Sequence, residues 1–191
     1  MSSVIANLLV NGVSGVTVGG TGTAAKFFPM VPGASIGVAS SNVGYIYLPN
    51  ANQVNGQRLS VRASGIFSVL GAACSTVTLE MVATKNVTAA SPTYTVIASS
   101  GSFTTSGDGY AVSQFAFSVD LIADGASGLL SGSQQVIINN ALQNTTPKVL
   151  SNTITGLTPS TDKWLALAMR VTFGTSDAAN TSTMYQFDVQ Q

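Results

Sequence analysis

The carboxylates are the residues of this chain with the most potential for chemistry, because a glycosidase places two of them across a sugar. Asp120 is expected at an outward strand position and Asp124 in the loop that follows, so the two could approach each other. Asp side chains that cap turns and strand ends explain both residues without catalysis. Ser160 and Lys163 are the nearest approach to a catalytic Ser-Lys dyad. They stand just before Trp164, where a polar turn that leads into a strand explains both residues without catalysis. We predict no catalytic residue and no enzyme activity.

Metal and cofactor chemistry lacks its usual ligands in this sequence. Histidine is absent, which excludes Ser-His and Cys-His pairs and histidine metal sites. The 7 Asp and Glu residues are dispersed, and none fits a calcium loop of the Asp-x-Asp-x-Asp-Gly type. No Gly-x-x-x-x-Gly-Lys-Ser/Thr run is present to hold phosphate. We predict no metal site and no cofactor.

A few charged and aromatic residues are better candidates for a binding interface. Arg58 and Arg62 are expected on the outward face of one strand and Glu80 on that of the next, so they can pair if these strands are neighbours. At a subunit contact, such a pair can fix orientation. Trp164 and Arg170 share the outward face of a later strand, and both residue types are enriched at interface hot spots. The alternatives are a solvated ion pair and a Trp164 ring that covers the end of the fold.

Composition narrows the class of protein further. The chain has 191 residues, enough for one domain, with 7 Lys and Arg, zero net charge, and 7% charged residues against about 25% in ordinary domains. So few cations and no net charge exclude binding to nucleic acid and binding to a membrane surface through a polybasic patch. A hydrophobic content of 45% excludes intrinsic disorder. So little charge protects a monomer poorly against association, which predicts assembly; a neutral Ser/Thr/Asn/Gln surface is the alternative.

Compartment signals are weak. Cys74 is alone, so no intrachain disulfide can form, and its apolar neighbours indicate a buried thiol. The first cation is Lys26, so we expect no secretory signal. Gly, Ser, Asn and Pro interrupt every apolar run, so we expect no membrane span.

Period-two alternation from residue 54 onward predicts a sheet protein without helices. The expected strands are 58–64, 76–83, 94–98, 114–122, 134–139, 149–155, 164–173 and 183–189. Gly65 is expected to shift the alternation, as a bulge does. Residues 129–142 come nearest to a helix, but a Ser-Gly-Ser run interrupts them. We predict an all-β antiparallel β-sandwich over 54–191, with a jelly roll as the leading topology and an immunoglobulin-like one as the alternative.

Residues 1–53 differ in composition from the rest of the chain. They carry one charge and alternate small with β-branched residues, which gives little material for a core. A compact apolar cluster then follows that charge: Lys26, Phe27, Phe28, Pro29 and Met30. We interpret this segment as an extended N-terminal arm with an apolar anchor. The alternative is that it forms the first strands of the same domain.

Three parts of the C-terminal half share one style of sequence. They are residues 115–125 (FAFSVDLIADG), residues 157–159 followed by 164–173 (WLALAMRVTF), and residues 185–189 (YQFDV). Together they resemble the jelly-roll decoration, or cement, proteins on the heads of tailed bacteriophages. The resemblance covers about residues 54–191, and the first 50 residues match nothing in it.

The resemblance implies a structural virion protein without catalytic residues. Such a protein would be a homotrimer at three-fold positions of the head surface, with an N-terminal arm touching the major capsid protein. It would be made in the host cytoplasm without a signal peptide. Another virion subunit of the shell, tail tube or fibre is one alternative. A carbohydrate- or receptor-binding β-sandwich module is another, in which aromatic rings stack on sugars; the candidate rings are Tyr45, Tyr47, Tyr94, Tyr110 and Trp164.

Overall fold

All secondary structure in the described part of the chain is β-strand. The computed structural model describes residues 4–9, 15–29, 43–49, 58–70, 76–84, 92–104, 110–124, 129–140, 148–154 and 164–190. These residues form strands β1 to β13 and no helix. A search of them accordingly finds no apolar helix of membrane-spanning length.

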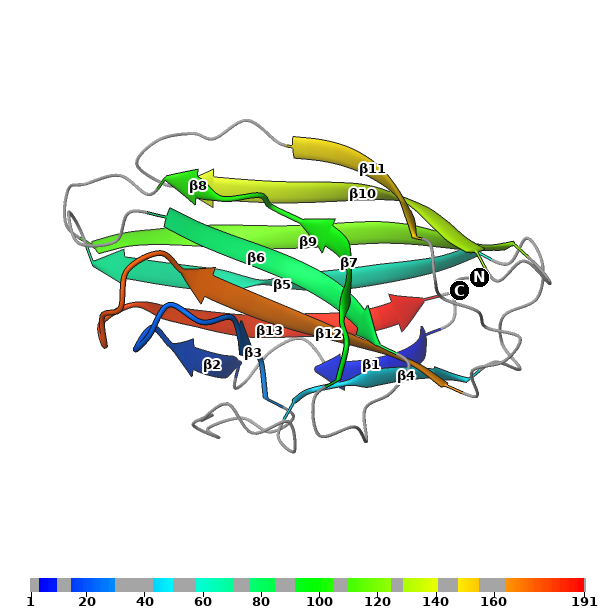
Figure 1. Cartoon of the computed structure of the whole chain (residues 1–191), viewed down its shortest axis with the longest axis horizontal. Helices are drawn as coiled ribbons and strands as arrows, with labels where there is room; N and C mark the ends of the chain where they lie inside the picture. Colours follow the sequence, from blue (N-terminus) through cyan, green and yellow to red (C-terminus); the bar gives the residue numbers. More distant parts are fainter. Residues whose placement is uncertain are drawn as a thin grey trace.

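The strands form two antiparallel sheets. The first contains β1 (Val4–Leu9), β2 (Val16–Gly19), β5 (Arg58–Leu70), β9 (Tyr110–Asp124), β10 (Leu129–Asn140), β11 (Lys148–Ile154) and β13 (Thr181–Gln190). The second contains β3 (Lys26–Phe27), β4 (Ile46–Pro49), β6 (Thr76–Thr84), β7 (Thr95–Ser99), β8 (Phe103–Thr104) and β12 (Trp164–Phe173). Figure 1 shows the long strands of both sheets running along the longest axis of the molecule. The predicted all-β antiparallel sandwich is confirmed.

The order of strands explains how the sandwich is connected. The seven-stranded sheet has the order β1-β13-β5-β9-β10-β11, with β2 also paired to β13. The six-stranded sheet has the order β3-β12-β6-β7, with β4 paired to β12 and β8 to β6. The chain therefore passes repeatedly from one sheet to the other, as in jelly-roll sandwiches.

Alternating side chains of the two sheets fill one hydrophobic core, as the period-two pattern predicts. Phe115, Phe117, Val119 and Leu121 enter it from β9, and Val77, Leu79, Met81 and Ala83 enter it from β6. Three rings are neighbours at its centre: the centroid of Phe115 lies 6.4 Å from that of Phe28 and 6.2 Å from that of Phe117. These separations suit tilted and edge-on aromatic packing.

The N-terminal strands complete one edge of each sheet. Both β1 and β2 pair with β13, while β3 and β4 pair with β12. Val4 lies opposite Gln190, so the two ends of the described chain are neighbours (Figure 1). The described part of residues 1–53 thus belongs to the sandwich and does not project from it as an arm.

Gly65 does not shift the alternation of β5, contrary to the prediction. Inward positions stay buried on both sides of it, from Leu59 to Val69. A Cβ at Gly65 would lie 2.7 Å from Cζ of Phe115, and closer still to the carbonyl oxygen of Thr183. Glycine is therefore needed for the close approach of neighbouring groups, and the bulge occurs on the partner strand β13.

Candidate functional site

The candidate site is a groove on the outer face of the seven-stranded sheet. Strand register places two rows of outward side chains next to each other across β13, β5, β9 and β10. The first row is Gln186, Ser64, Ala116 and Ile137, and the second is Asp188, Arg62, Ser118 and Gln135. Seven of these eight residues, all but Asp188, line a hollow of about 250 Å³, which we call the outer groove.

The outer groove follows from the sizes of the side chains in these rows. Ser64, Ala116 and Ser118 are small and lie on the two central strands. Gln186 on β13 and Gln135 on β10 are longer and stand on either side. Long side chains beside short ones leave a hollow over a pleated surface, because side chains stand roughly perpendicular to the sheet.

One wall of the outer groove is held by a chain of hydrogen bonds. Gln186 Nε2 donates to Asp188 Oδ2 at 2.6 Å, and Ser64 Oγ donates to Gln186 Oε1 at 3.2 Å. An ionised carboxylate only accepts hydrogen bonds, so it fixes which end of the Gln186 amide faces it. Asp188 is only 5% exposed, and its Oδ1 has no hydrogen-bond partner.

Arg62 is the cation of the outer groove. It lies opposite Asp188 on one neighbouring strand and Ser118 on the other, and it is exposed. No hydrogen bond or ion pair holds Arg62 or Arg58 within the described residues. Both arginines lie on the seven-stranded sheet, whereas Glu80 lies on the other sheet. The predicted pairing of Arg58 and Arg62 with Glu80 is therefore wrong.

Tyr185 is a large exposed side chain next to the outer groove in sequence. The sequence pattern places it on an apolar face with Phe187 and Val189. The bulge between Met184 and Gln186 changes that alternation: Met184 is fully buried while Tyr185 is 40% exposed. Uninterrupted alternation with Phe187 and Val189 would have buried Tyr185, and one extra residue in β13 turns its ring outward instead.

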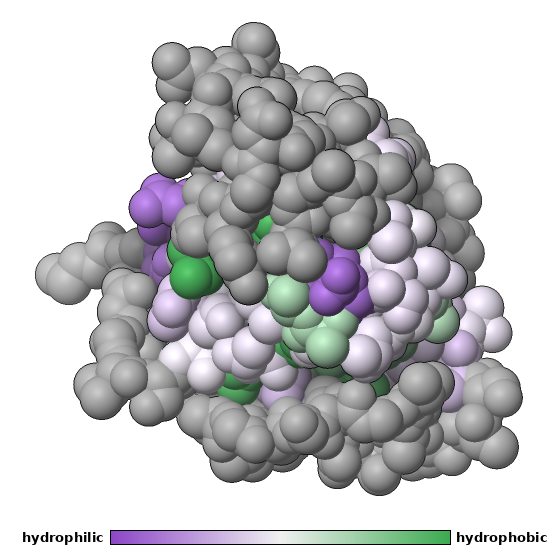
Figure 2. All heavy atoms as spheres, turned by 90° about the vertical axis from the view of Figure 1, so that its left-hand side faces the viewer, coloured by the Kyte–Doolittle hydropathy of each residue, from purple (hydrophilic) through white to green (hydrophobic). Residues whose placement is uncertain are grey.

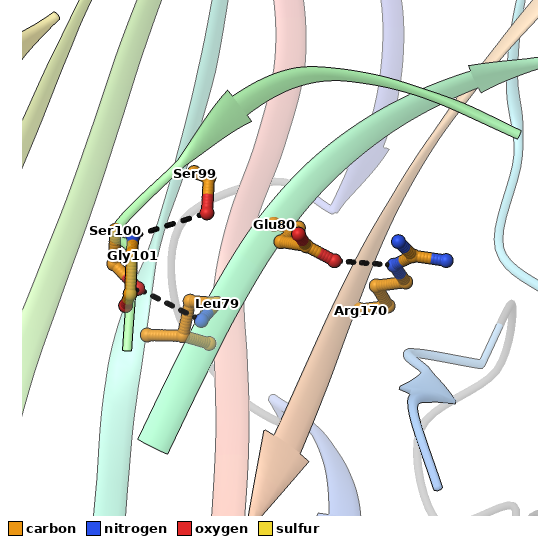
Figure 3. A network of polar contacts seen from close by, with 6 residues as sticks. All are labelled: Leu79, Glu80, Ser99, Ser100, Gly101 and Arg170. Carbon is orange, nitrogen blue, oxygen red and sulfur yellow. Dashed lines mark hydrogen bonds and ion pairs between the residues drawn. The ribbon is translucent and has the colours of Figure 1, made fainter. Parts of the chain in front are cut away.

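The outer face of the six-stranded sheet carries a cross-strand ion pair (Figure 3). Arg170 Nε donates to Glu80 Oε2 at 2.7 Å, and the two residues lie directly opposite each other on β12 and β6. Their side chains are 22% and 19% exposed. Glu80 thus has a cross-strand cationic partner, but the partner is Arg170.

The end of β7 is fastened to β6 close to this ion pair. The Ser100 hydroxyl accepts a hydrogen bond from the Leu79 amide at 2.9 Å, and the Ser99 hydroxyl accepts one from the Gly101 amide at 3.0 Å (Figure 3). The Ser100 hydroxyl thus supplements the backbone bond from Ser100 N to the Leu79 carbonyl, while Ser99 holds the turn that follows β7.

Two predicted sugar-stacking tyrosines are used for packing. Tyr45 is buried in a small cluster on the outer face of the six-stranded sheet, with Val82 and neighbouring residues. Its hydroxyl is hydrogen-bonded to that of Tyr94, whose ring centroid lies 4.6 Å from that of Phe27. The prediction that these rings form a stacking platform is wrong for Tyr45, and Tyr94 is half-buried between its partners.

The predicted apolar anchor is part of the protein itself. Phe28 is 1% exposed in the main core, and Pro29 is buried. Lys26 Nζ donates to the carbonyl oxygens of Gly19, at 2.8 Å, and of Thr21; partial burial lowers the pKa of this ammonium below its usual value. The interpretation of these residues as an anchor for another protein is wrong, because the pairing of β3 with β12 carries them into the sandwich.

Other predicted residues lie outside the described part of the chain. They are Met30 and Cys74, together with the side chains of Trp164, Tyr47, Tyr110 and Asp124. Asp120 is half-buried on the outer face of β9. Among the described side chains, no group of three or more His, Cys, Asp and Glu residues is placed to hold a metal ion.

The residues of the outer groove were not singled out from the sequence. Alternation does place Arg62, Ser118, Gln186 and Asp188 at outward positions. Only the sheet order brings β13, β5, β9 and β10 side by side, and β13 is separated from β5 by more than a hundred residues.

No protein-family model and no curated protein matches this chain. Among solved structures, it is similar to lectin UEA-II complexed with galactose, with 10% identity, a TM-score of 0.41 and coverage of 99% of this chain and 91% of that one. It is similar to a Lotus tetragonolobus seed lectin with 10% identity, a TM-score of 0.38 and coverage of 99% and 98%. It is also similar to lectin I from Ulex europaeus in complex with the methyl glycoside of alpha-L-fucose, with 9% identity, a TM-score of 0.38 and coverage of 100% and 90%. Similarity at these scores carries no conclusion about function.

Proposed function

We propose that this chain is a carbohydrate-binding module and that the outer groove is its binding site. The observation that carries the proposal is the two-row array of amide, hydroxyl and guanidinium groups over a floor of small residues. Sugar hydroxyls both donate and accept hydrogen bonds, as Ser and Gln side chains do. A hollow of about 250 Å³ is below the roughly 300–1,000 Å³ of drug-sized sites, which suits a single sugar ring.

The polar wall of the outer groove is organised before any ligand arrives. The hydrogen bonds from Ser64 to Gln186 and from Gln186 to Asp188 hold two of its side chains in place. A preorganised site loses less conformational freedom on binding. Tyr185, next to Gln186 in the chain, is an exposed ring with an apolar face and a polar tip, but it does not line the hollow itself.

Two glutamines provide a matched test. Gln135 lines the outer groove, while Gln114 is equally exposed on the same face but lies outside it. Ligands would be found on an array of neutral and acidic glycans and their affinities measured by titration calorimetry. We expect Gln135→Ala to weaken binding by about fivefold or more, and Gln114→Ala to leave it unchanged. The absence of any glycan ligand, or equal losses in both variants, would contradict the proposal.

A second candidate function is that of a structural virion protein that decorates a phage head as a homotrimer. The observation that favours it is the low charge of the chain, 7% with no net charge. Figure 2 shows one end of the sandwich, where much of the described surface is of intermediate hydropathy, with small separate hydrophilic and hydrophobic patches. Such a surface favours contacts that salt does not weaken. Because Phe28 lies in the core, docking on a major capsid protein would use exposed sheet faces and not this segment.

The oligomeric state tests this second candidate directly. Size exclusion with light scattering at low micromolar concentration gives the absolute mass of the particle. A single trimer peak, with isolated phage heads binding it equally at low and high salt, would support the decoration function. A monomer that binds no heads would count against it.

A further inference from the structure

We infer that the outer groove takes a sugar ring that carries a carboxylate, such as a uronic acid residue, with Arg62 as the residue that recognises the charge. This inference rests on the proposed carbohydrate-binding function and narrows its ligand class. Some polar groups of the outer groove are already hydrogen-bonded within the protein, and the chemistry of the ligand follows from the groups that remain available.

Two of the three side-chain acceptor oxygens that Gln186 and Asp188 bring to the β13 side are occupied, and the third, Asp188 Oδ1, is buried without a partner. Gln186 Oε1 accepts the Ser64 hydroxyl proton, and Asp188 Oδ2 accepts one Nε2 proton of Gln186. Asp188 is almost completely buried, so its carboxylate is not offered to a ligand. What Gln186 still offers is its second Nε2 proton, which is a donor.

Arg62 adds further hydrogen-bond donors to the outer groove. Its guanidinium has five N–H groups and cannot accept, and no described residue holds it. The other cations with described side chains are engaged or elsewhere. Lys26 donates to backbone carbonyls and Arg170 to Glu80, and Arg58 lies four residues before Arg62 on β5, outside the hollow. A site with free donors and a free guanidinium calls for a ligand that offers acceptors and negative charge.

A carboxylate meets this requirement better than a sugar hydroxyl. It accepts two parallel N–H bonds from one guanidinium, and charge-assisted bonds of this kind are roughly twice as strong as neutral ones. Asp188 lies opposite Arg62 but is buried and makes no ion pair with it, so the guanidinium is available to a ligand. Ser118 and Gln135, next to Arg62 across β9 and β10, remain to bind the hydroxyls of the same ring.

The test uses ligands and variants that differ in one group. The ligands are a uronic acid trisaccharide and its methyl ester, which has the same ring without the charge. The variants are Arg62→Gln and Arg58→Gln, two exposed arginines of β5 of which only Arg62 lines the hollow. We expect the wild type to prefer the acid to the ester by about tenfold or more. Arg62→Gln should abolish this preference and Arg58→Gln should retain it.

The failure of this inference can be separated from that of the proposed function. Equal affinity for acid and ester, with binding still lost in Gln135→Ala, would overturn the carboxylate inference and leave the carbohydrate site standing. No binding of any saccharide would overturn both. A polyglutamate peptide bound as tightly as the acidic trisaccharide would show that Arg62 recognises carboxylates in general and would overturn the assignment to a sugar.

Discussion

Replacement of Phe28 by alanine tests whether the N-terminal segment is part of the fold. The ring is 1% exposed and lies 6.4 Å from that of Phe115 in the main core. Truncation of a buried Phe to Ala costs about 3–5 kcal/mol, through the lost transfer energy and the cavity left behind. A typical domain is stable by about 5–15 kcal/mol, so this single substitution would remove at least about a fifth of the free energy of unfolding.

Urea unfolding followed by tryptophan fluorescence measures this loss. With a denaturant slope of about 3 kcal/mol per molar, at the upper end for small proteins, the midpoint should fall by about 1–1.7 M. Phe27→Ala is the matched control, because the neighbouring ring packs on the outer face of the six-stranded sheet and is only half-buried. Its expected cost is on the order of 1–2 kcal/mol.

A loss below about 1 kcal/mol in Phe28→Ala would refute the placement of this segment in the core. The same conclusion would follow if removal of residues 1–53 left a chain that unfolds cooperatively at an unchanged midpoint. An arm that merely touches another protein would give both results. Strands that complete the edges of both sheets would give neither.

Three further experiments test single contacts by substitution. Gly65→Ala should lower the melting temperature measured by calorimetry by roughly 3–10 °C, because its Cβ would meet Phe115 and the Thr183 carbonyl. Gly19→Ala is the control and should have little effect, because a Cβ at Gly19 would have nothing within 4 Å. In a double-mutant cycle of Glu80→Gln and Arg170→Gln, the coupling energy should be about 0–1 kcal/mol, and a larger value would show that the pair is less solvated than its exposure indicates. Burial lowers the pKa of Lys26 from 10.5, so the folded state binds fewer protons than the unfolded state just below that pH, and stability should rise as the pH increases through this alkaline window. Urea midpoints of Lys26→Met should lack that part of the rise, and an identical pH profile in both proteins would contradict it.

The sheets could be predicted from the sequence because each long strand buries one face. The alternation of Phe115 to Leu121 and of Val77 to Ala83 gives correct inward faces and an antiparallel sandwich. Val82 shows where this reasoning stops: it is at an outward position but fully buried, because residues of a distant segment, including Tyr45, cover it. Alternation within one strand does not show which distant residues pack over its outward face.

The outer groove could not be predicted, because it depends on sheet order and on one bulge. Arg62 and Gln186 are far apart in the chain and meet only because β13 lies beside β5. The bulge in β13 then decides that Tyr185 points outward. Likewise, the sequence predicts that Phe28 is an exposed anchor, because its segment is poor in large residues. Only the pairing of β3 with β12 shows that its ring is in the core.

The strand pairing at the sheet edges has a consequence for the order of events on the ribosome. The four N-terminal strands, β1 to β4, have only β12 and β13 as partners in the described sheets. During synthesis, β1 to β4 therefore lack these strand partners until residues 164–190 have left the exit tunnel. Pairings this distant in sequence form slowly, and unpaired strands are open to association with other chains. Translation rate and chaperone contact before β12 and β13 emerge should thus control how much of this protein reaches its native state.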